Sequence, residues 1–577
     1  MNPSLRPLAS ALCALSLATP AAFAVGPYAP VTDARLASPE PANWLQYRGN
    51  YGGWGYSPLD KINAGNVGKL QLAWSLSTGQ TEGHQSPPIV NNGYMYVTTP
   101  GAQVIALEAA TGQELWRWKK DLAPDLMQLH PTNRGVALYG DKVYVATVDA
   151  ALVALDAKTG KVAWTAQVGD PKALQYITLA PLAAKGKIMV GSSGGETGVR
   201  GFIAAFDADT GKEAWRTFTT AAPGEPGGDT WPGDSHKNGG GSIWITGSYD
   251  AATNLAYWGT GNPAPWPTEG RKGDNLYTTS AIALDVDSGK IRGHHQYHHN
   301  DAWDWDEVSA PVLIDTEVKG RKVKAAVHAG RNGYLWMLER KPDGKIGFID
   351  AVPYVHNNVF TGIDKTTGRP SYDESKRPGM GKAVSFCPSL WGGKDWPPEA
   401  WNPKTGLFYI PANNNLCAEL PEAEPTKYKK GDLYIGYPIE GVLGSLRYKD
   451  GQKPSTIGEL QAWDLKTGKM AWVHKFDTHL WAPLLTTGGN LLFAGGTNDR
   501  QFRAFDARDG KVLWQHSMPS GVTGVPTSFE VDGEQYVAVQ AGWGVDTQRM
   551  QAGIDSLTGK VHAVPQGGTV MVFKLKN

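Results

Sequence analysis

The stretch Asp156-Ala-Lys-Thr-Gly-Lys-Val-Ala-Trp164 decides the fold, because close copies of it recur along the chain. The copies are Glu108–Trp116, Asp207–Trp215, Asp464–Trp472 and Asp506–Trp514, with a degenerate version at Asp285–Arg292 that ends without the tryptophan. In each copy one strand runs into a tight turn, where the glycine supplies a positive φ, and a second strand leaves carrying the tryptophan. Each copy therefore predicts a β-hairpin.

The spacing of the copies predicts how the hairpins assemble. Adjacent copies lie about 40 to 50 residues apart, which is the length of one four-stranded propeller blade. A single such sheet cannot bury both of its faces, whereas sheets arranged in a ring can. The 577 residues suffice for eight blades with insertions, and the many glycines, tryptophans and tyrosines favour short strands over helices. We therefore predict an all-β, eight-bladed β-propeller in which the tryptophans pack between neighbouring blades as a girdle.

The two ends of the chain are expected to share one blade. The N-terminal portion from Trp44 to Trp74 and the last strand, Thr569–Leu575, would complete it, which closes the ring and removes free sheet edges. Residues 25–577 are thus predicted to form a single domain. Two segments, residues 354–381 and 420–454, interrupt the blade rhythm, and long loops of this kind in a compact fold are usually functional covers.

Residues 1–24 have the features of a cleavable secretory signal. Arg6 precedes an apolar run from Leu8 to Ala22, and the small residues Ala22 and Ala24 predict cleavage after Ala24. A membrane anchor is the alternative, but an apolar run of about 14 residues is shorter than the about 20 needed to span a bilayer. The mature chain should therefore be periplasmic, without a membrane anchor.

Charge and cysteine content narrow the partners and the redox state. The 55 basic and 55 acidic residues leave no net charge, so nothing indicates binding to nucleic acid or to an anionic membrane. Once Cys13 leaves with the signal, Cys387 and Cys417 remain, and an oxidising compartment favours a disulfide between them over two separate buried thiols. The sequence contains no Cys-x-x-Cys-His segment of the kind that attaches haem in a fused cytochrome.

The stretch Asn300-Asp-Ala-Trp-Asp-Trp-Asp-Glu307 concentrates four acidic residues and interleaves two tryptophans. In a strand or an extended loop, Asp304 and Asp306 would point the same way, because side chains alternate with period two. Two carboxylates in one pocket favour a cation between them, which predicts a hard metal ion. An acidic, solvated turn with two packed tryptophans is the alternative.

With these features placed, the chain resembles the exported quinoprotein alcohol dehydrogenases, the methanol and ethanol dehydrogenase family that uses pyrroloquinoline quinone (PQQ). The resemblance extends over nearly all of the mature chain. Besides the repeats and the acidic stretch, it rests on the motifs Gly191–Gly201, Gly239–Trp244, Gly259–Trp266, Gly330–Gly333 and Cys387–Asp395. It implies an eight-bladed propeller that holds the quinone and a metal ion in its central funnel and oxidises an alcohol to an aldehyde or ketone.

The resemblance assigns the metal to Glu196, Asn262 and Asp304, which are all hard oxygen donors. Asp306 adds an expectation, because lanthanide-dependent members of the family have an aspartate there, where calcium-dependent members have a small uncharged residue. An additional carboxylate balances the higher charge of a trivalent ion. We therefore predict a lanthanide site, with calcium as the alternative if Asp306 points away.

For the cofactor, the resemblance implies that Trp244 forms the floor beneath the quinone and that Arg134 pairs with the carboxylates of the quinone. Further cofactor contacts fall at Gln85, Ser193, Gly194, Gly195, Arg331, Asp395 and Trp481. In catalysis, Asp304 would take the proton from the substrate hydroxyl, Arg331 would stabilise the developing oxyanion, and a hydride would pass to metal-activated PQQ.

Two departures from the family bear on the substrate. Adjacent cysteines that commonly lie over the quinone are replaced by Gln128 and Leu129, so Leu129, with His130, is the expected ceiling. Gln85 stands where the family often has glutamate. A softened ceiling is compatible with an alcohol bulkier than methanol or ethanol. Electrons would leave to a separate, soluble cytochrome c.

Other interpretations remain open. Related propellers without quinone serve as non-catalytic scaffolds, and these would lack the cofactor residues. A calcium-dependent hydrolase built on a propeller would lack quinone absorbance. The assembly is also open, and a homodimer is one alternative.

Overall fold

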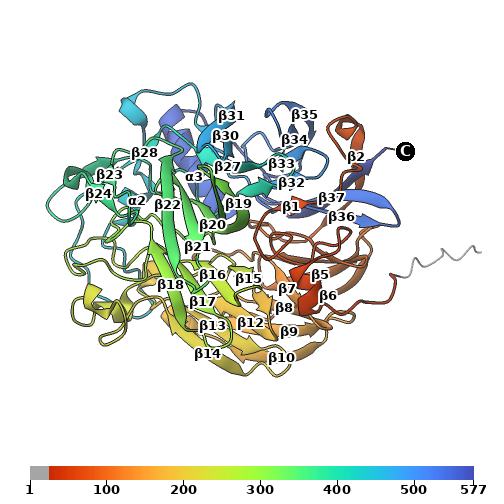
Figure 1. The fold of residues 1–577 in the computed structure, drawn as a ribbon, viewed down its shortest axis with the longest axis horizontal. Helices are drawn as coiled ribbons and strands as arrows, with labels where there is room; N and C mark the ends of the chain where they lie inside the picture. Colours follow the sequence, from red (N-terminus) through yellow and green to blue (C-terminus); the bar gives the residue numbers. More distant parts are fainter. Residues whose placement is uncertain (1–24, 577) are drawn as a thin grey trace, which may run out of the picture.

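β-strands dominate the computed structural model, which describes residues 25–576. The predicted signal sequence, residues 1–24, lies outside the described residues. Eight sheets of four or five strands are arranged in a ring (Figure 1). The predicted all-β propeller is therefore confirmed, and the eight sheets match the predicted number of blades.

We number the blades from the first four-stranded sheet along the chain. Blades 1 to 4 are β3 (Ile89–Asn91), β4 (Tyr94–Thr99), β5 (Gln103–Glu108) and β6 (Glu114–Lys119); β7 (Val136–Tyr139), β8 (Lys142–Ala146), β9 (Ala151–Asp156) and β10 (Val162–Gln167); β11 (Leu182–Ala184), β12 (Lys187–Gly191), β13 (Phe202–Asp207) and β14 (Glu213–Phe218); and β15 (Ser248–Asp250), β16 (Leu255–Gly259), β17 (Ser280–Asp285) and β18 (Ile291–Gln296).

Blades 5 to 8 follow, and the last two recruit strands from the N-terminal part of the chain. They are β19 (Val312–Val318), β20 (Arg321–Ala329), β21 (Tyr334–Arg340) and β22 (Ile346–Pro353); β26 (Ala400–Asn402), β27 (Leu407–Asn413), β30 (Gly458–Asp464) and β31 (Lys469–Phe476); β1 (Tyr56–Ser57), β32 (Leu485–Thr487), β33 (Leu491–Ala494), β34 (Gln501–Asp506) and β35 (Val512–Ser517); and β2 (Leu70–Ser77), β38 (Thr569–Leu575), β37 (Glu534–Ala541) and β36 (Thr527–Val531).

Each repeated motif forms the hairpin between two neighbouring strands of a blade, and its tryptophan docks on the next blade. Trp164 of β10 donates its indole N–H to the carbonyl of Ala208 in blade 3, at 3.0 Å. Trp74, Trp116, Trp215, Trp472 and Trp514 make the corresponding bond. A β-bulge precedes Trp164, so the outer strand twists just where the indole must turn toward the neighbouring blade. The predicted tryptophan girdle is therefore confirmed.

The first and last strands of the ring lie side by side. β2 pairs antiparallel with β38, so both ends of the chain contribute to blade 8, as predicted. The stretch from Trp44 to Asn50 was predicted to join the same blade, and that prediction is wrong. Trp44 instead pairs with Val90 of β3, because its fully buried indole belongs to the core beside blade 1.

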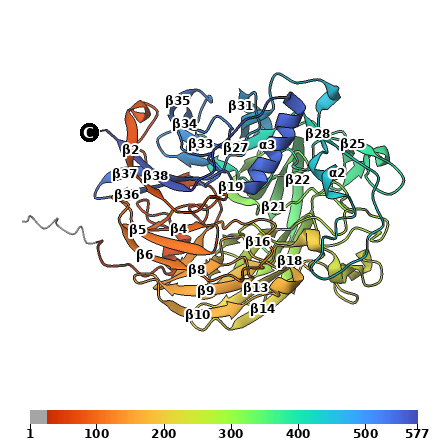
Figure 2. The same cartoon turned by 180° about the vertical axis from the view of Figure 1, so that it is seen from behind.

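Insertions between the blades carry the remaining elements. Residues 354–381 include the hairpin β23 (Phe360–Ile363) and β24 (Pro370–Tyr372), and residues 420–454 include α2 (Ile439–Leu443) and β29 (Leu446–Tyr448). A small sheet joins β29 to β28 (Leu416–Leu420) and β25 (Val384–Phe386). The short helix α1 (Asp33–Ala37) precedes the ring, and α3 (Gly544–Thr558) is inserted between β37 and β38 and contacts β29. Figure 2 shows α3, in blue, on the side facing the viewer.

Helix length also bears on membrane insertion. Within residues 25–576, none of the helices is long and apolar enough to cross a lipid bilayer.

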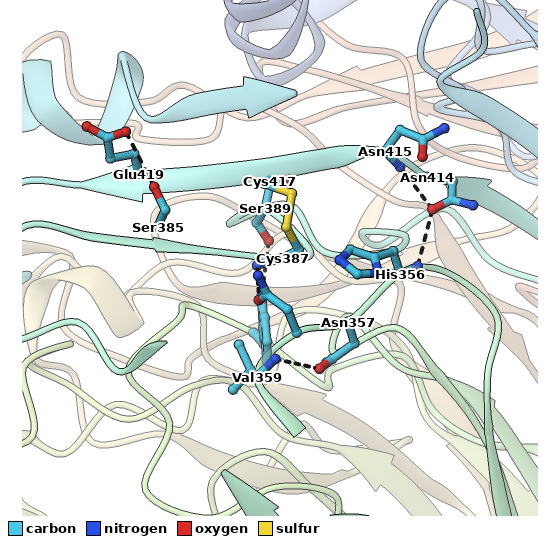
Figure 3. Close-up of a disulfide and its surroundings, with 12 residues drawn as sticks. His356, Asn357, Val359, Ser385, Cys387, Ser389, Asn414, Asn415, Cys417 and Glu419 are labelled. Carbon is cyan, nitrogen blue, oxygen red and sulfur yellow. Dashed lines mark hydrogen bonds between the residues drawn. A yellow bond between two sulfur atoms is a disulfide. The ribbon is translucent and has the colours of Figure 1, made fainter. Parts of the chain in front are cut away.

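Cys387 and Cys417 form the predicted disulfide, which ties the end of β25 to β28 (Figure 3). The side chain of Asn358 supports it by accepting a hydrogen bond from the backbone N–H of Cys387 at 2.8 Å. Just beyond the bridge, the N–H of Ser389 donates to the carbonyl of Leu416 at 3.0 Å. The disulfide therefore fixes the strand end that leads into the central cavity.

Candidate active site

One cavity, with a volume of about 260 Å³, collects most of the predicted site residues. The predicted residues on its wall are Leu129, His130, Arg134, Ser193, Gly194, Glu196, Trp244, Asp304, Asp306, Arg331, Asp395 and Trp481. The predicted residues Gln85, Gly195 and Asn262 are buried and do not line it. Loops from several blades thus bring together side chains that lie far apart in the sequence.

The acidic stretch is an irregular loop, yet its side chains alternate as predicted. Trp303 and Trp305 are fully buried and stack with their ring centroids 5.2 Å apart, whereas Asp304 and Asp306 line the cavity. Asp304 has a φ of +61°, a left-handed conformation that aspartate adopts more readily than most residues. The packing of the two tryptophans, and not regular strand geometry, therefore directs both aspartates toward the cavity.

Asp301 anchors this loop, a role that sequence reasoning did not assign. Its fully buried carboxylate accepts the backbone N–H groups of Trp303 at 3.2 Å, Asp304 at 3.0 Å and Trp305 at 3.4 Å. It also lies 2.9 Å from Nε2 of His298. An aspartate that bonds the backbone two residues further on is a common turn former, so the spacing to Trp303 was the available signal.

Glu307 anchors the next loop in the same way. Its fully buried carboxylate accepts the N–H of Arg331 at 3.1 Å and that of Asn332 at 3.2 Å, and it lies 2.6 Å from Nε2 of His328. Because these bonds fix the backbone at Arg331, Glu307 determines the position from which the Arg331 side chain extends into the cavity. Of the four acidic residues in the stretch, two therefore position loops and two face the cavity.

Arg331 connects the carboxylates of the cavity. Its Nη2 lies 2.7 Å from Asp395, and its Nη1 lies 3.7 Å from the carboxylate of Asp304 and 3.8 Å from that of Asp306. Its Nη1 also donates to the backbone carbonyl of Asp304 at 2.8 Å. Burial opposes the charge of Arg331, but Asp395, Asp306 and Asp304 together raise its pKa above the ordinary value.

Negative charge is crowded in this cavity. Burial raises the pKa of Asp304 well above its usual range; Arg331 opposes the shift, while Asp306 and Glu196 add to it. Burial, with a contribution from Glu196, raises the pKa of Asp306 to about 7. Carboxylates this close are not all ionised unless a cation compensates them. A second cation besides Arg331 would restore the charged forms.

Asn262 offers an oxygen for such a cation. Its Oδ1 is buried without a hydrogen-bond partner, and its backbone N–H donates to Asp306 at 2.7 Å. With Glu196 and Asp304, these are donors that suit a hard cation. In residues 25–576, no three His, Cys, Asp or Glu side chains are placed to hold an ion by themselves. A bound ion would therefore also need amide and ligand oxygens, which hard cations accept readily.

A tryptophan and a buried arginine on another part of the wall form a slot that suits a planar anion. The indole N–H of Trp244 donates to Asp306 at 3.2 Å, which fixes the plane of the ring. The guanidinium of Arg134 lies 5.0 Å from the ring centroids of both Trp244 and Trp396 and donates to Thr178 at 2.6 Å. Its buried Nε has no partner within the described chain. These groups fit a flat ligand that carries carboxylates.

Part of the cavity wall is formed by apolar residues that were not singled out individually from the sequence. These are Leu433, Ile435, Ile439, Val442 and Leu443, which belong to the predicted cover at residues 420–454. Leu433, Ile439 and Leu443 are 44%, 43% and 48% exposed, which is unusual for clustered large apolar side chains. Asp546 and Arg549 of α3 line the same cavity.

The other predicted cover, residues 354–381, does not line the cavity. It braces the acidic loop from behind, because the carbonyl of Lys376 accepts the indole N–H of Trp303 at 2.8 Å.

A propeller whose central cavity combines carboxylates, a bridging arginine and a slot for a planar anion has the architecture of a quinone-dependent dehydrogenase. A family model described as PQQ, glucose/ethanol/alcohol dehydrogenase, beta-propeller domain, matches residues 44–353 and 361–537. The chain belongs to this family of PQQ-dependent alcohol dehydrogenases.

Individual relatives agree. The chain is 38% identical over 548 residues to the quinoprotein alcohol dehydrogenase PedH of Pseudomonas putida, covering 90% of this chain and 89% of the relative. It is 37% identical over 534 residues to the lanthanide-dependent methanol dehydrogenase of Methylacidiphilum fumariolicum, covering 88% and 85%. Among solved structures, a europium-containing methanol dehydrogenase matches with a TM-score of 0.87 at 34% identity, covering 94% of this chain and 100% of that one. The chain is therefore an oxidoreductase, and the scaffold and hydrolase interpretations are set aside.

Proposed function

We propose that this chain is a periplasmic, lanthanide-dependent dehydrogenase for alcohols that carry an apolar body larger than that of ethanol, and that it passes electrons to a separate, soluble cytochrome c. The observation that carries the proposal is the meeting of Asp304, Asp306 and Arg331 with an apolar wall in one cavity. The compartment and the electron acceptor rest on the resemblance to exported members of the family.

The carboxylate of Asp304 is best placed to act as the base. Asp306 accepts hydrogen bonds from Asn262 and Trp244, whereas no side chain or backbone N–H in residues 25–576 donates to the Asp304 carboxylate. Its lone pairs are therefore available for the proton of a substrate hydroxyl. Arg331, at 3.7 Å, stabilises the negative charge that develops on the substrate oxygen. PQQ with its metal ion, when bound, supplies the hydride acceptor.

Asp304→Asn tests the base. Asparagine tolerates a φ of +61°, so the loop should keep its shape while the base is lost. We expect turnover to fall by about a thousandfold, with PQQ still bound as judged by its absorbance. Turnover near that of the wild type would reject this role for Asp304.

Asp306→Asn tests the choice of ion. The apoprotein would be loaded with PQQ and either lanthanum or calcium, and dye reduction would be measured. We expect lanthanum to support more activity than calcium in the wild type. In the variant, the fold loss of the lanthanum-supported rate should be at least about tenfold larger than the fold loss of the calcium-supported rate, because one anionic ligand is missing. Preference for calcium in the wild type would reject the ion and leave the dehydrogenase assignment standing.

Ile439→Ser tests the substrate class. Placing a hydroxyl in the apolar wall should lower kcat/KM for a six-carbon primary alcohol by about tenfold and that for ethanol by less than about threefold. Met380→Ser is a matched control, because Met380 is 46% exposed and does not line the cavity. Fastest turnover of methanol and ethanol by the wild type would contradict the proposed substrate.

A further inference from the structure

Residues 121–131 form a loop ahead of blade 2 that brings Leu129 and His130 to the cavity. No side chain of this loop is buried, so core packing does not anchor it. Within residues 25–576, the one hydrogen bond or ion pair that joins it to a segment distant in sequence links Nδ1 of His130 to Oδ1 of Asp546 at 2.8 Å. The ring of His130 also lies near that of Tyr176, with centroids 6.4 Å apart.

The other side of this contact is firmly held. Asp546 lies in the first turn of α3, where a carboxylate interacts favourably with the helix dipole. The buried side chains Thr547, Met550 and Ile554 pack α3 onto the molecule. At the start of the helix, the N–H of Val545 donates to the carboxylate of Glu82 at 3.1 Å. The helix is therefore a fixed support for a loop that otherwise lacks one.

The surrounding charges favour an ion pair. Partial burial works against a charged His130, but Asp546 and then Glu196 outweigh it and raise its pKa. Burial likewise works against a charged Asp546, but His130 and Arg549 lower its pKa. Arg549 lies 3.4 Å from the same carboxylate, so Asp546 is held between two basic side chains.

We propose that the His130–Asp546 pair is the clasp that positions residues 121–131 as the ceiling over the cofactor slot. Both are positioning residues, because neither contacts the carboxylates that carry the chemistry. Leu129, one residue away, is then held over the slot by a contact that spans 416 positions of the chain. The identity of the ligand under the ceiling rests on the proposed function, whereas the clasp is a property of the chain itself.

Hydrogen–deuterium exchange of the full chain without cofactor tests the clasp. Asp546→Asn and His130→Gln should each raise exchange in peptides covering residues 121–131 by about tenfold, because local opening becomes easier. Asp125→Asn is the matched control, since it makes the same charge change at an exposed position of the same loop. Unchanged exchange in both variants overturns the proposal. If Asp546→Asn also loosens peptides from α3, then His130→Gln, which leaves the helix intact, decides.

The dissociation rate of PQQ, followed by tryptophan fluorescence, tests the ceiling. Each single variant should release PQQ about tenfold faster, and the double variant no faster than either, because both substitutions remove the same contact. Equal release rates in wild type and variants overturn the role as a ceiling. A wild type that does not bind PQQ rejects the proposed function, and the exchange experiment then still decides the clasp.

Discussion

Asp301 decides where Asp304 points, although it does not line the cavity. Its buried carboxylate accepts the backbone N–H groups of three successive residues, Trp303, Asp304 and Trp305, so one buried side chain sets the shape of the loop. Such an anchor is needed because a φ of +61° costs energy for a residue other than glycine. The base and the group that positions it are therefore separate residues.

Asp301→Asn should separate positioning from chemistry. The substitution turns one acceptor oxygen into a donor that faces N–H groups. We expect unfolding free energy to fall by about 1–3 kcal/mol and kcat to fall about a hundredfold, as displaced catalytic groups typically do. The affinity for PQQ should change little, because Arg134 and Trp244 are not bonded to Asp301. Steady-state kinetics and urea denaturation measure these effects.

Asp207→Asn is the matched control for that substitution. Asp207 also caps a turn, accepting the N–H of Thr210 at 2.9 Å, but it is an exposed residue of a blade hairpin and is absent from the cavity wall. Its kinetic constants should stay close to those of the wild type. A similar loss of kcat in both variants would mean that the effect of Asp301 is not local.

Site residues whose chemical type is informative by itself could be predicted from the sequence. Residues whose role depends on a partner far away in the chain could not. Paired carboxylates at Asp304 and Asp306 are informative by themselves, because their repulsion demands compensation. Asp546 has no such local signature, since its role depends on His130, far away in the chain. Gln85, which the resemblance marks as a cofactor contact, is buried and does not line the cavity, and its Oε1 has no hydrogen-bond partner within residues 25–576, so its role stays a prediction.

Among the elements, the repeated hairpin depends on a fit between its glycine and the tryptophan of the preceding blade. Gly211 has a φ of +71°, and a Cβ there would lie 2.6 Å from the ring of Trp164. Gly112, Gly160, Gly289 and Gly510 meet the tryptophan of the preceding blade in the same way. Both residues are required at a fixed spacing, which is why the blades could be recognised from the sequence.

Gly211→Ala and Gly406→Ala together isolate the contribution of this contact. Both glycines have positive φ, +71° and +68°, so alanine should cost about 1 kcal/mol at each position. A Cβ at Gly406 would meet nothing within 4 Å, whereas one at Gly211 would press on Trp164. We expect Gly211→Ala to lose a further 1–3 kcal/mol or so, measured by urea denaturation. Equal losses would show that the docking contact contributes nothing.

The helix α3 marks the limit of reasoning from repeats. Its buried residues are few, and polar Thr547 and Gln551 are among them together with Met550 and Ile554. Such a segment lacks the apolar stripe by which helices are recognised. It also lies between two strands of one blade, where the rhythm of the repeat predicts only a connection. The clasp on His130 therefore became visible only in the structure.

For the molecule as a whole, the ring is closed by strands from opposite ends of the chain. This closure could be predicted, because four-stranded blades leave incomplete sets at the two ends and an open ring would expose sheet edges. The pairing of β2 with β38 confirms it. The position of Trp44 could not be predicted, because a single bridge to Val90 leaves no periodic pattern in the sequence.

Buried histidines make the stability of the whole ring depend on pH. Burial lowers the pKa of His84 to about 4, that of His295 to about 3 and that of His479 to about 4. Unfolding restores a pKa of about 6.5. As the pH falls below that value, the unfolded chain takes up protons that the folded chain refuses, so stability decreases down to the folded-state pKa. Above about pH 6.5, these groups contribute no pH dependence.

His479→Gln should therefore flatten the acid side of the stability curve. His479 is fully buried, and its Nε2 has no partner within the described chain, so an amide removes the proton uptake with little lost bonding. Between about pH 6.5 and pH 4, the free energy of unfolding of the variant should fall less steeply, by about 1.4 kcal/mol per pH unit. Urea denaturation across this range measures both slopes, and above it the two curves should run parallel. Parallel curves in the acid range as well would mean that His479 is already protonated in the folded ring, and that the space beside Trp543 accommodates a charge.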